Sequence, residues 1–326
     1  MVEKLLQVKN LVKHFPIRKG FFRRTVGAVK AVDGIDFYIR QGECLGMVGE
    51  SGCGKSTVGR AAIRLLEPTD GSIHFLGQDL RALAPSALRR WRRQVQVIFQ
   101  DPLASLNPRK TIVESIGDPL LHHGLAIDLD ERDAQVAQVL IEVGLTPDAM
   151  NRYPHQFSGG QQQRICIGRA LALKPKLIIC DEAVSALDVS VQAQILNLLA
   201  DLREKHNLSY LFISHDLSVV RHLCDRVVVL YLGKVVEVAG VDELFTDPKH
   251  PYTQFLLSAV PKEHPNEKRS PLHITGEIPS PSNPPKGCPF HTRCPYAQPI
   301  CAQEPPPTRS FVGKDGLRHE YHCVIS

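Results

Sequence analysis

The sequence predicts an α/β fold built around a largely parallel sheet. Two continuous apolar segments, residues 177–180 and 210–214, have the composition of strands that are buried on both faces. The segment between them has an apolar face at helical spacing, formed by Val191, Ile195, Leu198, Leu199 and Leu202. A further apolar strand ends at Val48 and runs into a glycine-rich turn and a helix. Buried strands that alternate with helices indicate a sheet covered on both sides, with ligands at the carboxyl ends of its strands.

The other elements follow the same pattern. Residues 5–15, 34–40 and 43–49 are predicted strands, residues 55–66 a helix, and residues 110–150 mainly helices. Fifteen of the 24 prolines lie between Pro248 and Pro307, and prolines do not permit long regular elements. We therefore expect an α/β body and a loop-rich extension, with a boundary between residues 245 and 260.

Composition narrows the class of protein. The chain has 326 residues, 43% of them apolar, and a net charge of +5, which does not by itself indicate a nucleic-acid partner. No apolar run reaches the roughly 18 residues of a membrane span, and the first residues have no pattern of a secretion signal. With no export signal, the nine cysteines favour reduced thiols or metal ligands over disulfides.

The turn after Val48 has the pattern G-x-x-x-x-G-K-[ST], with a strand before it and a helix after it. Its glycines allow successive backbone N–H groups to face an anion, and the helix adds its positive N-terminal end. A lysine reaches the β- and γ-phosphates in such loops, and the next hydroxyl ligates Mg²⁺. The predicted phosphate site comprises Gly49, Glu50, Ser51, Gly52, Cys53, Gly54, Lys55, Ser56 and Thr57.

Polar side chains also follow the other apolar strands. Asp181 and Glu182 come directly after residues 177–180, where Asp181 would ligate Mg²⁺ and Glu182 would orient or deprotonate the attacking water. His215 follows residues 210–214 and would donate a hydrogen bond to the γ-phosphate. Gln100 ends a fourth strand and would contact Mg²⁺ or the water.

A second glycine-rich helix start consists of Ser158, Gly159, Gly160 and Gln161. One bound nucleotide does not need two such sites. This segment therefore predicts an anion site that engages a nucleotide held by another subunit.

Together these residues resemble the ATP-binding subunits of ABC transporters. The resemblance covers roughly residues 5–260, and it includes S-A-L-D at 185–188 as well as the motifs above, all in the family's order. It implies a P-loop NTPase core over residues 1–255, with a helical subdomain at about 102–165, followed by an extension over 256–326. Two departures are visible: Phe157 replaces a usual Leu, and Ala183 replaces a common Pro. Neither removes a reacting group.

The resemblance also implies roles for individual residues. Two subunits would sandwich two ATP molecules, with Ser158 of each meeting the γ-phosphate bound by the other. Lys55, Ser56 and Asp181 would hold phosphates and Mg²⁺, with Glu182 as the catalytic base. Gln100 would link the site to membrane subunits, and Asp188 would belong to a loop at the dimer interface. Phe15 is the candidate for stacking on adenine, with Phe21 and Phe22 nearby.

Three further segments, residues 100–109, 250–261 and 276–288, resemble dipeptide/oligopeptide permease subunits, particularly the second ATPase of a heterodimer. This implies ATP-driven import of short peptides at the cytoplasmic face of the inner membrane. The implied partners are a second ATP-binding subunit, two membrane-spanning permease subunits and a peptide-binding protein, but no nucleic acid. Nickel and glutathione importers share much of this pattern and remain alternatives.

The extension carries four cysteines, Cys288, Cys294, Cys301 and Cys323. Their spacing is not that of a zinc ribbon, so spacing leaves unlinked thiols and metal ligands both open. The resemblance to peptide permeases implies a [4Fe–4S] cluster at these positions. His291, His319 and His322 lie nearby and keep zinc as an alternative. Cys44, Cys166, Cys180 and Cys224 are predicted to be small buried residues of the body.

Two basic segments raise another class of function. Seven Lys or Arg residues and no acid lie between Lys4 and Asp33, and four arginines surround Trp91. Neither lies on a recognisable nucleic-acid-binding fold. An ABC ATPase that acts on DNA or ribosomes would need a long coiled coil or a second cassette, and residues 57–158 are too few for the first.

Overall fold

The computed structural model describes residues 4–21, 24–260, 274 and 276–325. Phe22 and Arg23 of the basic segment lie outside these residues. The chain divides into two compact units, each described by itself. Unit 1 comprises residues 40–43 and 82–212, and unit 2 comprises residues 4–39, 44–81 and 213–325.

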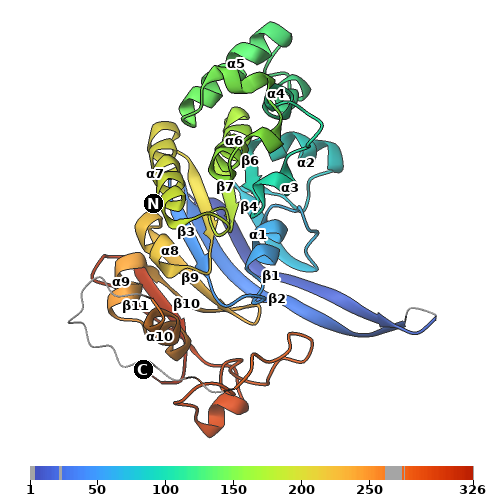
Figure 1. Cartoon of the computed structure of the whole chain (residues 1–326). Helices are drawn as coiled ribbons and strands as arrows, with labels where there is room; N and C mark the ends of the chain where they lie inside the picture. The colour runs from blue at the N-terminus through green and yellow to red at the C-terminus, as the bar shows by residue number, and fades with distance from the viewer. Residues whose placement is uncertain (1–3, 22–23, 261–273, 275, 326) are drawn as a thin grey trace. The chain divides into compact units, whose positions relative to one another are not determined.

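Unit 1 contains the strands β8, β7 and β6, in this order, and most of the helices (Figure 1). Its strands are β6 (Val95–Ile98), β7 (Leu177–Asp181) and β8 (Ser209–Ile213). Its α-helices are α2 (Pro85–Trp91), α3 (Pro102–Ser105), α4 (Ile112–His122), α5 (Leu129–Glu142), α6 (Gly159–Ala172) and α7 (Val189–His206). Short 3₁₀ helices are η1 (Arg92–Gln94), η2 (Pro147–Asn151) and η3 (Pro154–Gln156).

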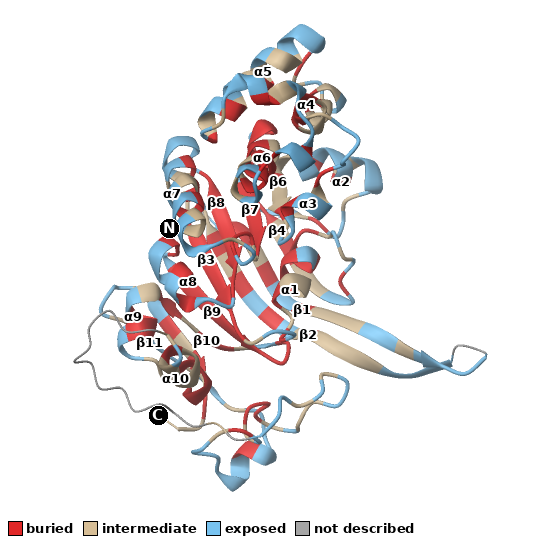
Figure 2. Cartoon of the chain, viewed as in Figure 1, coloured by how far each residue is buried: buried red, intermediate tan, exposed pale blue. Residues whose placement is uncertain are grey.

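Burial explains why unit 1 forms. Every residue of β7 and β8 is buried, and both strands are red along their length in Figure 2. Helices α4, α5 and α6 pack around a separate apolar core that includes Ile116, Val136, Leu140 and Ile165. Burying such side chains stabilises the fold by about 1.5–3 kcal/mol each. Capping side chains begin α4, α5, α6 and α7, so each helix starts at a residue that the sequence marks.

Unit 2 contains a four-stranded sheet in the order β2-β1-β4-β5 and a row of strands in the order β11-β12-β10-β9-β3. The strands are β1 (Lys4–Lys19), β2 (Arg24–Arg40), β3 (Cys44–Val48), β4 (Asp70–Phe75), β5 (Gln78–Asp79), β9 (Arg226–Tyr231), β10 (Lys234–Gly240), β11 (Thr308–Val312) and β12 (Arg318–His322). The helices are α1 (Lys55–Ala62), α8 (Leu217–Leu223), α9 (Val241–Thr246), α10 (Pro251–Ser258) and the 3₁₀ helix η4 (Pro299–Ala302).

The expected parallel pairing is confirmed for two pairs of strands. Strands β3 and β9 pair in parallel in unit 2, and β6 and β7 pair in parallel in unit 1. The other described pairs of unit 2, β1 with β4, β4 with β5, β9 with β10, β10 with β12 and β11 with β12, are antiparallel. Unit 2 thus contains antiparallel strand pairs that the sequence did not predict.

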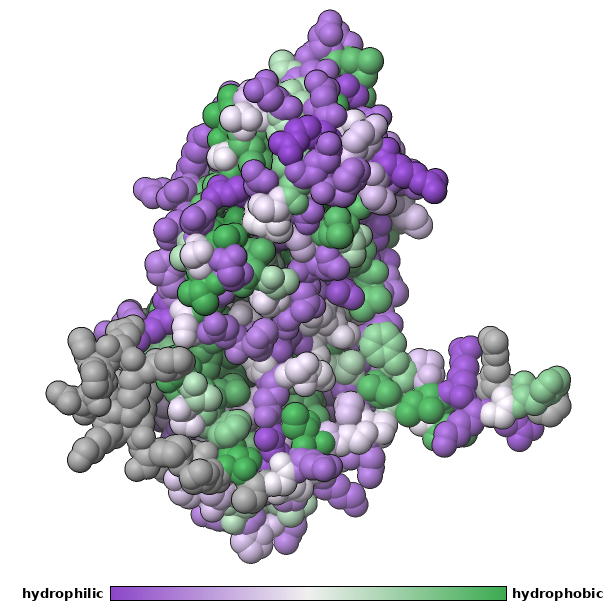
Figure 3. Space-filling model, in the orientation of Figure 1, coloured by the Kyte–Doolittle hydropathy of each residue, from purple (hydrophilic) through white to green (hydrophobic). Residues whose placement is uncertain are grey.

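Strands β1 and β2 form a long ribbon whose end extends away from the other strands of unit 2 (Figure 1). Its end mixes hydrophilic and hydrophobic residues (Figure 3), and Phe21 is 97% exposed there. In the part of the chain that the structure describes, no helix is both long and apolar enough to cross a membrane.

Candidate functional site: a phosphate loop, two strand-end acids and a second helix start

The phosphate loop lies between the fully buried strand β3 and helix α1 of unit 2. Its helix begins after Gly54, whose φ of 105° lies in the left-handed region, and no side chain caps it. A Cβ atom at Gly54 would lie 2.2 Å from the carbonyl oxygen of Ala31, and one at Gly49 would lie 2.2 Å from that of Leu230. Only glycine fits at these two positions, because backbone atoms occupy the space of a side chain.

Lys55 is fixed inside this loop. Its side chain is only 4% exposed, and its Nζ donates to the carbonyl oxygens of Gly49, at 2.7 Å, and of Glu50, at 3.1 Å. The ammonium group is thus held by the loop that it serves, which lowers the entropy cost of presenting it to a phosphate. Ser56 and Thr57 follow in the first turn of α1 and are half-buried, whereas Ser51 and Gly52 are exposed.

Cys53 lies under the loop, not at its surface. Its side chain is 5% exposed, and burial raises the pKa of its thiol. Its carbonyl oxygen accepts a hydrogen bond of 2.9 Å from the N–H of Gly233, in the turn between β9 and β10. The thiol therefore supports the loop by packing, since a neutral buried thiol is a poor nucleophile.

His215 lies at the same edge of unit 2 as the phosphate loop. The N–H of its neighbour Ser214 donates to the carbonyl oxygen of Met47, two residues before Gly49. The imidazole is exposed. This placement agrees with the expected neighbourhood of His215 and the phosphate loop.

Phe15 belongs to β1 and is 37% exposed. The Nζ of Lys13 lies 5.1 Å from the centre of its ring. The neighbouring His14 bonds to Asp33 at 3.0 Å, and the N–H of Asp33 donates to Gly233, the residue that also bonds to Cys53. This chain of contacts joins the Phe15 region to the phosphate loop, whereas Phe21 lies at the far end of the ribbon.

Unit 1 holds the other predicted site residues. Asp181 ends β7 and is 3% exposed, and the half-buried Glu182 follows it. Glu182 has a φ of 52°, which is strained for a residue with a side chain, and its carbonyl oxygen accepts from the N–H and the hydroxyl of Ser185. Strands β6 and β7 pair Ile98 with Cys180. Gln100 and Glu182 therefore each lie two residues after this pair, at the same edge of the sheet.

The second helix start has its own side-chain partners. The hydroxyl of Ser158 accepts from the N–H of Gln161 at 3.4 Å, and the side chain of Gln161 accepts from the N–H of Ser158 at 3.1 Å. This is a capping box, which supplies partners for N–H groups that a helix leaves free. Asp188 caps α7 in a similar manner, and hydrogen bonds from the Val191 N–H and the Ser190 hydroxyl lower its pKa.

The sequence did not show that Gly160 is also needed for close packing. A Cβ atom at Gly160 would lie 2.5 Å from Cγ1 of Val191, so the glycine lets the starts of α6 and α7 approach closely. The S-G-G-Q pattern indicated an anion site but not this contact, because Val191 is 31 residues away in the sequence. No sequence pattern identifies such a partner.

The four cysteines of the extension lie in unit 2. Cys288, Cys301 and Cys323 are buried, and Cys294 is half-buried. Burial raises the pKa of Cys288 to about 11, and the nearby thiols Cys323, Cys301 and Cys294 act in the same direction. Burial also raises the pKa values of Cys294 and Cys323, on which Cys301 again acts. The four sulfur atoms are therefore close enough to influence one another.

The sulfur of Cys301 accepts a hydrogen bond of 3.5 Å from the N–H of Gln298. Backbone groups of Phe290, Tyr296 and Ile325 lower the pKa values of Cys288, Cys294 and Cys323 and offset part of the effect of burial. Backbone hydrogen bonds to sulfur are typical around thiolates that ligate a metal or a cluster. Yet among the described residues no group of three or more Cys, His, Asp or Glu side chains is arranged to hold a metal ion. Four thiols could ligate a metal centre, but among the described residues their side chains are not positioned to bind one.

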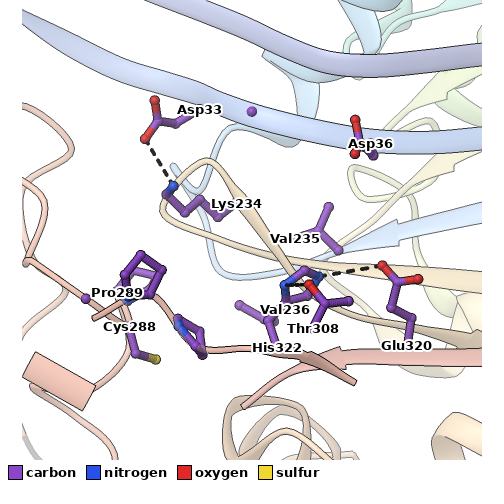
Figure 4. A pocket seen from close by; sticks show the side chains of 14 residues that line it. Asp33, Asp36, Lys234, Val235, Val236, Cys288, Pro289, Thr308, Glu320 and His322 are labelled. Carbon is purple, nitrogen blue, oxygen red and sulfur yellow. Dashed lines mark hydrogen bonds and ion pairs between the residues drawn. The ribbon is translucent and has the colours of Figure 1, made fainter. Parts of the chain in front are cut away.

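A pocket of about 250 Å³ opens beside Cys288 (Figure 4). Asp33 and Lys234 form an ion pair of 3.3 Å on one side. On the other side His322 lies between the hydroxyl of Thr308, at 3.3 Å, and the carboxylate of Glu320, at 3.8 Å. Burial lowers the pKa of His322. The pocket is polar and distinct from the phosphate loop. Cys44, Cys166, Cys180 and Cys224 are buried, as expected.

The comparisons with known proteins identify the family of the chain. The family described as "ABC transporter" matches residues 32–185, and the "Oligopeptide/dipeptide transporter, C-terminal region" matches residues 236–301. The solved dimeric ATP-binding cassette MJ0796, bound to ADP and Pi in a post-hydrolysis state, is 29% identical with a TM-score of 0.65. The match covers 72% of this chain and 98% of that one. The chain cbiO1 from Clostridium perfringens is similar in fold, with 24% identity, a TM-score of 0.64, and coverage of 75% and 92%.

A P-loop ATPase of the ABC type is the class that this fold and these residues define. Relatives that align with more than nine-tenths of the chain identify the family within this class. The oligopeptide transport ATP-binding protein AppF of Bacillus subtilis (strain 168) is 56% identical, covering 93% of each chain. OppF of Salmonella typhimurium (strain LT2), with the same description, is 51% identical, covering 98% of this chain and 96% of the relative. The chain belongs to this family of ABC transporter ATP-binding subunits, which confirms the resemblance found in the sequence.

Proposed function

We propose that this chain is the ATP-hydrolysing subunit of an importer that takes up dipeptides or oligopeptides across the cytoplasmic membrane. The observation that carries the proposal is the oligopeptide/dipeptide C-terminal region at residues 236–301, which follows a full set of ABC site residues in one chain. The names of the relatives support peptides over nickel or glutathione as cargo. The ATPase domain spans residues 1–255, with its helical subdomain at about 102–165, and the extension spans 256–326.

The chemistry assigns a task to each group. The backbone N–H groups from Gly49 to Gly54 and the ammonium of Lys55 bind the β- and γ-phosphates, with Phe15 stacking on adenine. Ser56, Asp181 and Gln100 supply the oxygen ligands that suit Mg²⁺, which neutralises developing phosphate charge when bound.

Hydrolysis needs a base and a donor near the γ-phosphate. Glu182 accepts a proton from the attacking water, and the imidazole of His215 donates a hydrogen bond to a γ-phosphate oxygen. The half-buried position of Glu182 at a strand end supports this role, because its carboxylate faces less competition from bulk water.

Turnover needs a second subunit. Ser158, Gly159, Gly160 and Gln161 engage the γ-phosphate held by the other ATP-binding subunit of a heterodimer, and Asp188 contributes to the interface. Two permease subunits, contacted near Gln100, and a peptide-binding protein complete the importer at the cytoplasmic face of the inner membrane.

The four cysteines ligate a [4Fe–4S] cluster, with zinc as the competing occupant. The mutual influence of the four thiols and the N–H bond that Cys301 accepts from Gln298 support this assignment. Raised thiol pKa values mean that binding must release protons. Purification without oxygen, with assays of iron and acid-labile sulfide, tests it. Zinc alone, or no metal, contradicts the cluster.

The decisive experiment for the motor uses Glu182→Gln. The variant should bind ATP normally, lose turnover and accumulate as a dimer with its partner subunit, because only the proton acceptor is lost. Lys55→Ala is the matched control, which should lose binding itself. Normal hydrolysis by Glu182→Gln contradicts the base assignment. In cells, uptake of labelled tripeptide should stop with Glu182→Gln, while unchanged peptide uptake and reduced nickel or glutathione uptake would redirect the cargo.

A further inference from the structure

An ion pair joins the four-cysteine segment to the phosphate loop. Arg293 Nη1 lies 2.6 Å from Oε2 of Glu50, and Nη2 lies 3.0 Å from Oε1, so the pair is bidentate. The side chain of Arg293 is 8% exposed and that of Glu50 20%. The same Nη1 donates to the hydroxyl of Tyr231 at 3.4 Å. Paired and hydrogen-bonded in this way, the two charges are far less screened than a surface pair.

Glu50 is held at three points. Besides the Arg293 pair, its N–H donates to the hydroxyl of Tyr252 at 2.8 Å, and its carbonyl oxygen accepts from Lys55 at 3.1 Å. Its position in the loop is therefore set partly from the loop itself and partly from residues after 230. A loop that must point N–H groups at an anion gains from such preorganisation.

The negative charge of Glu50 makes its pairing with Arg293 important for phosphate binding. A carboxylate in a phosphate loop repels the polyphosphate that the loop binds, because like charges at a partly buried site are poorly screened. Arg293 turns the carboxylate toward itself and offsets its charge. The loop thus presents Lys55 and its N–H groups without an uncompensated negative neighbour.

Arg293 is itself fixed by the extension. It precedes Cys294, and its N–H donates to the carbonyl oxygen of Phe290 at 3.0 Å. The Phe290 ring packs against Tyr231 and Tyr252, with ring centres 5.2 and 5.3 Å apart. The segment 288–294 therefore packs on Tyr252, which also bonds to the phosphate loop.

We propose that Arg293 is a positioning residue of the ATP site, through which the C-terminal extension turns the Glu50 carboxylate away from the bound phosphates and neutralises its charge. The inference rests on the proposed ATP site. It makes the extension a component of nucleotide binding in addition to any role in metal binding.

The test measures MgATP affinity by calorimetry and steady-state ATP hydrolysis on the full chain with its partner subunit. Arg293→Ala should weaken MgATP binding about tenfold and raise KM more than it lowers kcat, because the pair acts on phosphate binding. Glu50→Gln should change the affinity by less than about threefold, because it removes the repulsion together with the pair. Arg293→Lys should fall between Arg293→Ala and the unaltered chain.

The double variant Arg293→Ala with Glu50→Gln separates charge from mere structure. It should bind MgATP within about threefold of the unaltered chain, because the carboxylate that Arg293 neutralises is gone. Arg318→Ala is the matched control, since Arg318 forms an exposed ion pair with Glu320 in the same extension. It should leave affinity unchanged.

Two results overturn the proposal: unchanged MgATP affinity in Arg293→Ala, or a double variant as weak as Arg293→Ala. Melting temperature and iron content identify a variant that has simply lost its fold or its cluster. If Arg293→Ala is such a variant, the MgATP affinities of Glu50→Gln and of the double variant test the proposal instead. An unaltered chain that does not bind ATP would instead refute the proposed function, so the two failures are distinguishable.

Discussion

The two glycine-rich helix starts, before α1 and before α6, differ in how the N-terminus of the helix is capped. Helix α1 follows a left-handed Gly54, which supplies no side-chain cap. Helix α6 follows Ser158, whose hydroxyl and N–H are both paired with Gln161. The first start has no side-chain cap, whereas an external anion at the second would compete with the bonds between Ser158 and Gln161. The difference supports the proposal that the first start binds a nucleotide alone and that the second acts with a partner subunit.

The glycines of the two helix starts differ in what prevents a side chain at their position. At Gly54 a side chain would meet the backbone of Ala31, which cannot move without shifting a strand. At Gly160 it would meet a methyl group of Val191, which a second substitution can remove. One requirement is absolute and the other depends on the neighbouring residue.

Gly54→Ala should have the largest effect. Its φ of 105° and the backbone contact at 2.2 Å would force the loop to open, so MgATP binding should fall about 100-fold or more, equivalent to about 2.7 kcal/mol. Calorimetry with MgATP measures this. Gly52→Ala is the control, because a Cβ there has open space, and its φ of 79° costs only about 1 kcal/mol of stability. Equal losses in the two variants would contradict the argument.

Gly160→Ala should reduce ATP turnover about tenfold while MgATP binding stays unchanged. The added methyl group would push the start of α6 from Val191, a branched and stiff side chain. The double variant Gly160→Ala with Val191→Ala restores the space and should recover most of the turnover. A double variant slower than Gly160→Ala would show that the glycine is needed for some other reason.

Ser158→Ala should lower the free energy of unfolding by about 1 kcal/mol, because the capping bond to Gln161 is lost, and it should slow turnover. Ser158→Asp keeps the cap but places a negative charge where a γ-phosphate is expected. It should therefore retain stability in urea and still lose turnover. Full activity of Ser158→Asp would separate this serine from phosphate recognition.

The smallest effect concerns two buried thiols, Cys53 under the loop and Cys166 in α6. Burial raises the pKa of both, so at pH 7.5 the thiols stay neutral and iodoacetamide should label them far more slowly than in urea. The stabilisation that their raised pKa values give is fully present below about pH 9 and is lost as the pH rises further. Rapid labelling of Cys53 alone would mean that the loop opens and the helix does not.

The part of the site that the sequence predicts consists of local patterns. The motif around Lys55, the acids after β7 and the capping box at Ser158 each depend on residues within about ten positions, which a single chain displays. The pair of Glu50 with Arg293, 243 residues apart, and the contact of Gly160 with Val191 depend on how distant segments pack. Local sequence motifs do not show which distant residues will be in contact. The antiparallel strands β4 and β5 were likewise not predicted, because their short segments lack a clear alternating pattern.

The left-handed backbone at Glu182 implies that activity and stability are in conflict at this residue. An ordinary side chain at a φ of 52° carries about 1–2 kcal/mol of strain, whereas asparagine tolerates this conformation better. Glu182→Asn should therefore raise the melting temperature while it stops turnover, and Glu182→Gln should stop turnover without that gain. Selection for a more thermostable protein alone would be expected to eliminate the residue that we propose as the catalytic base.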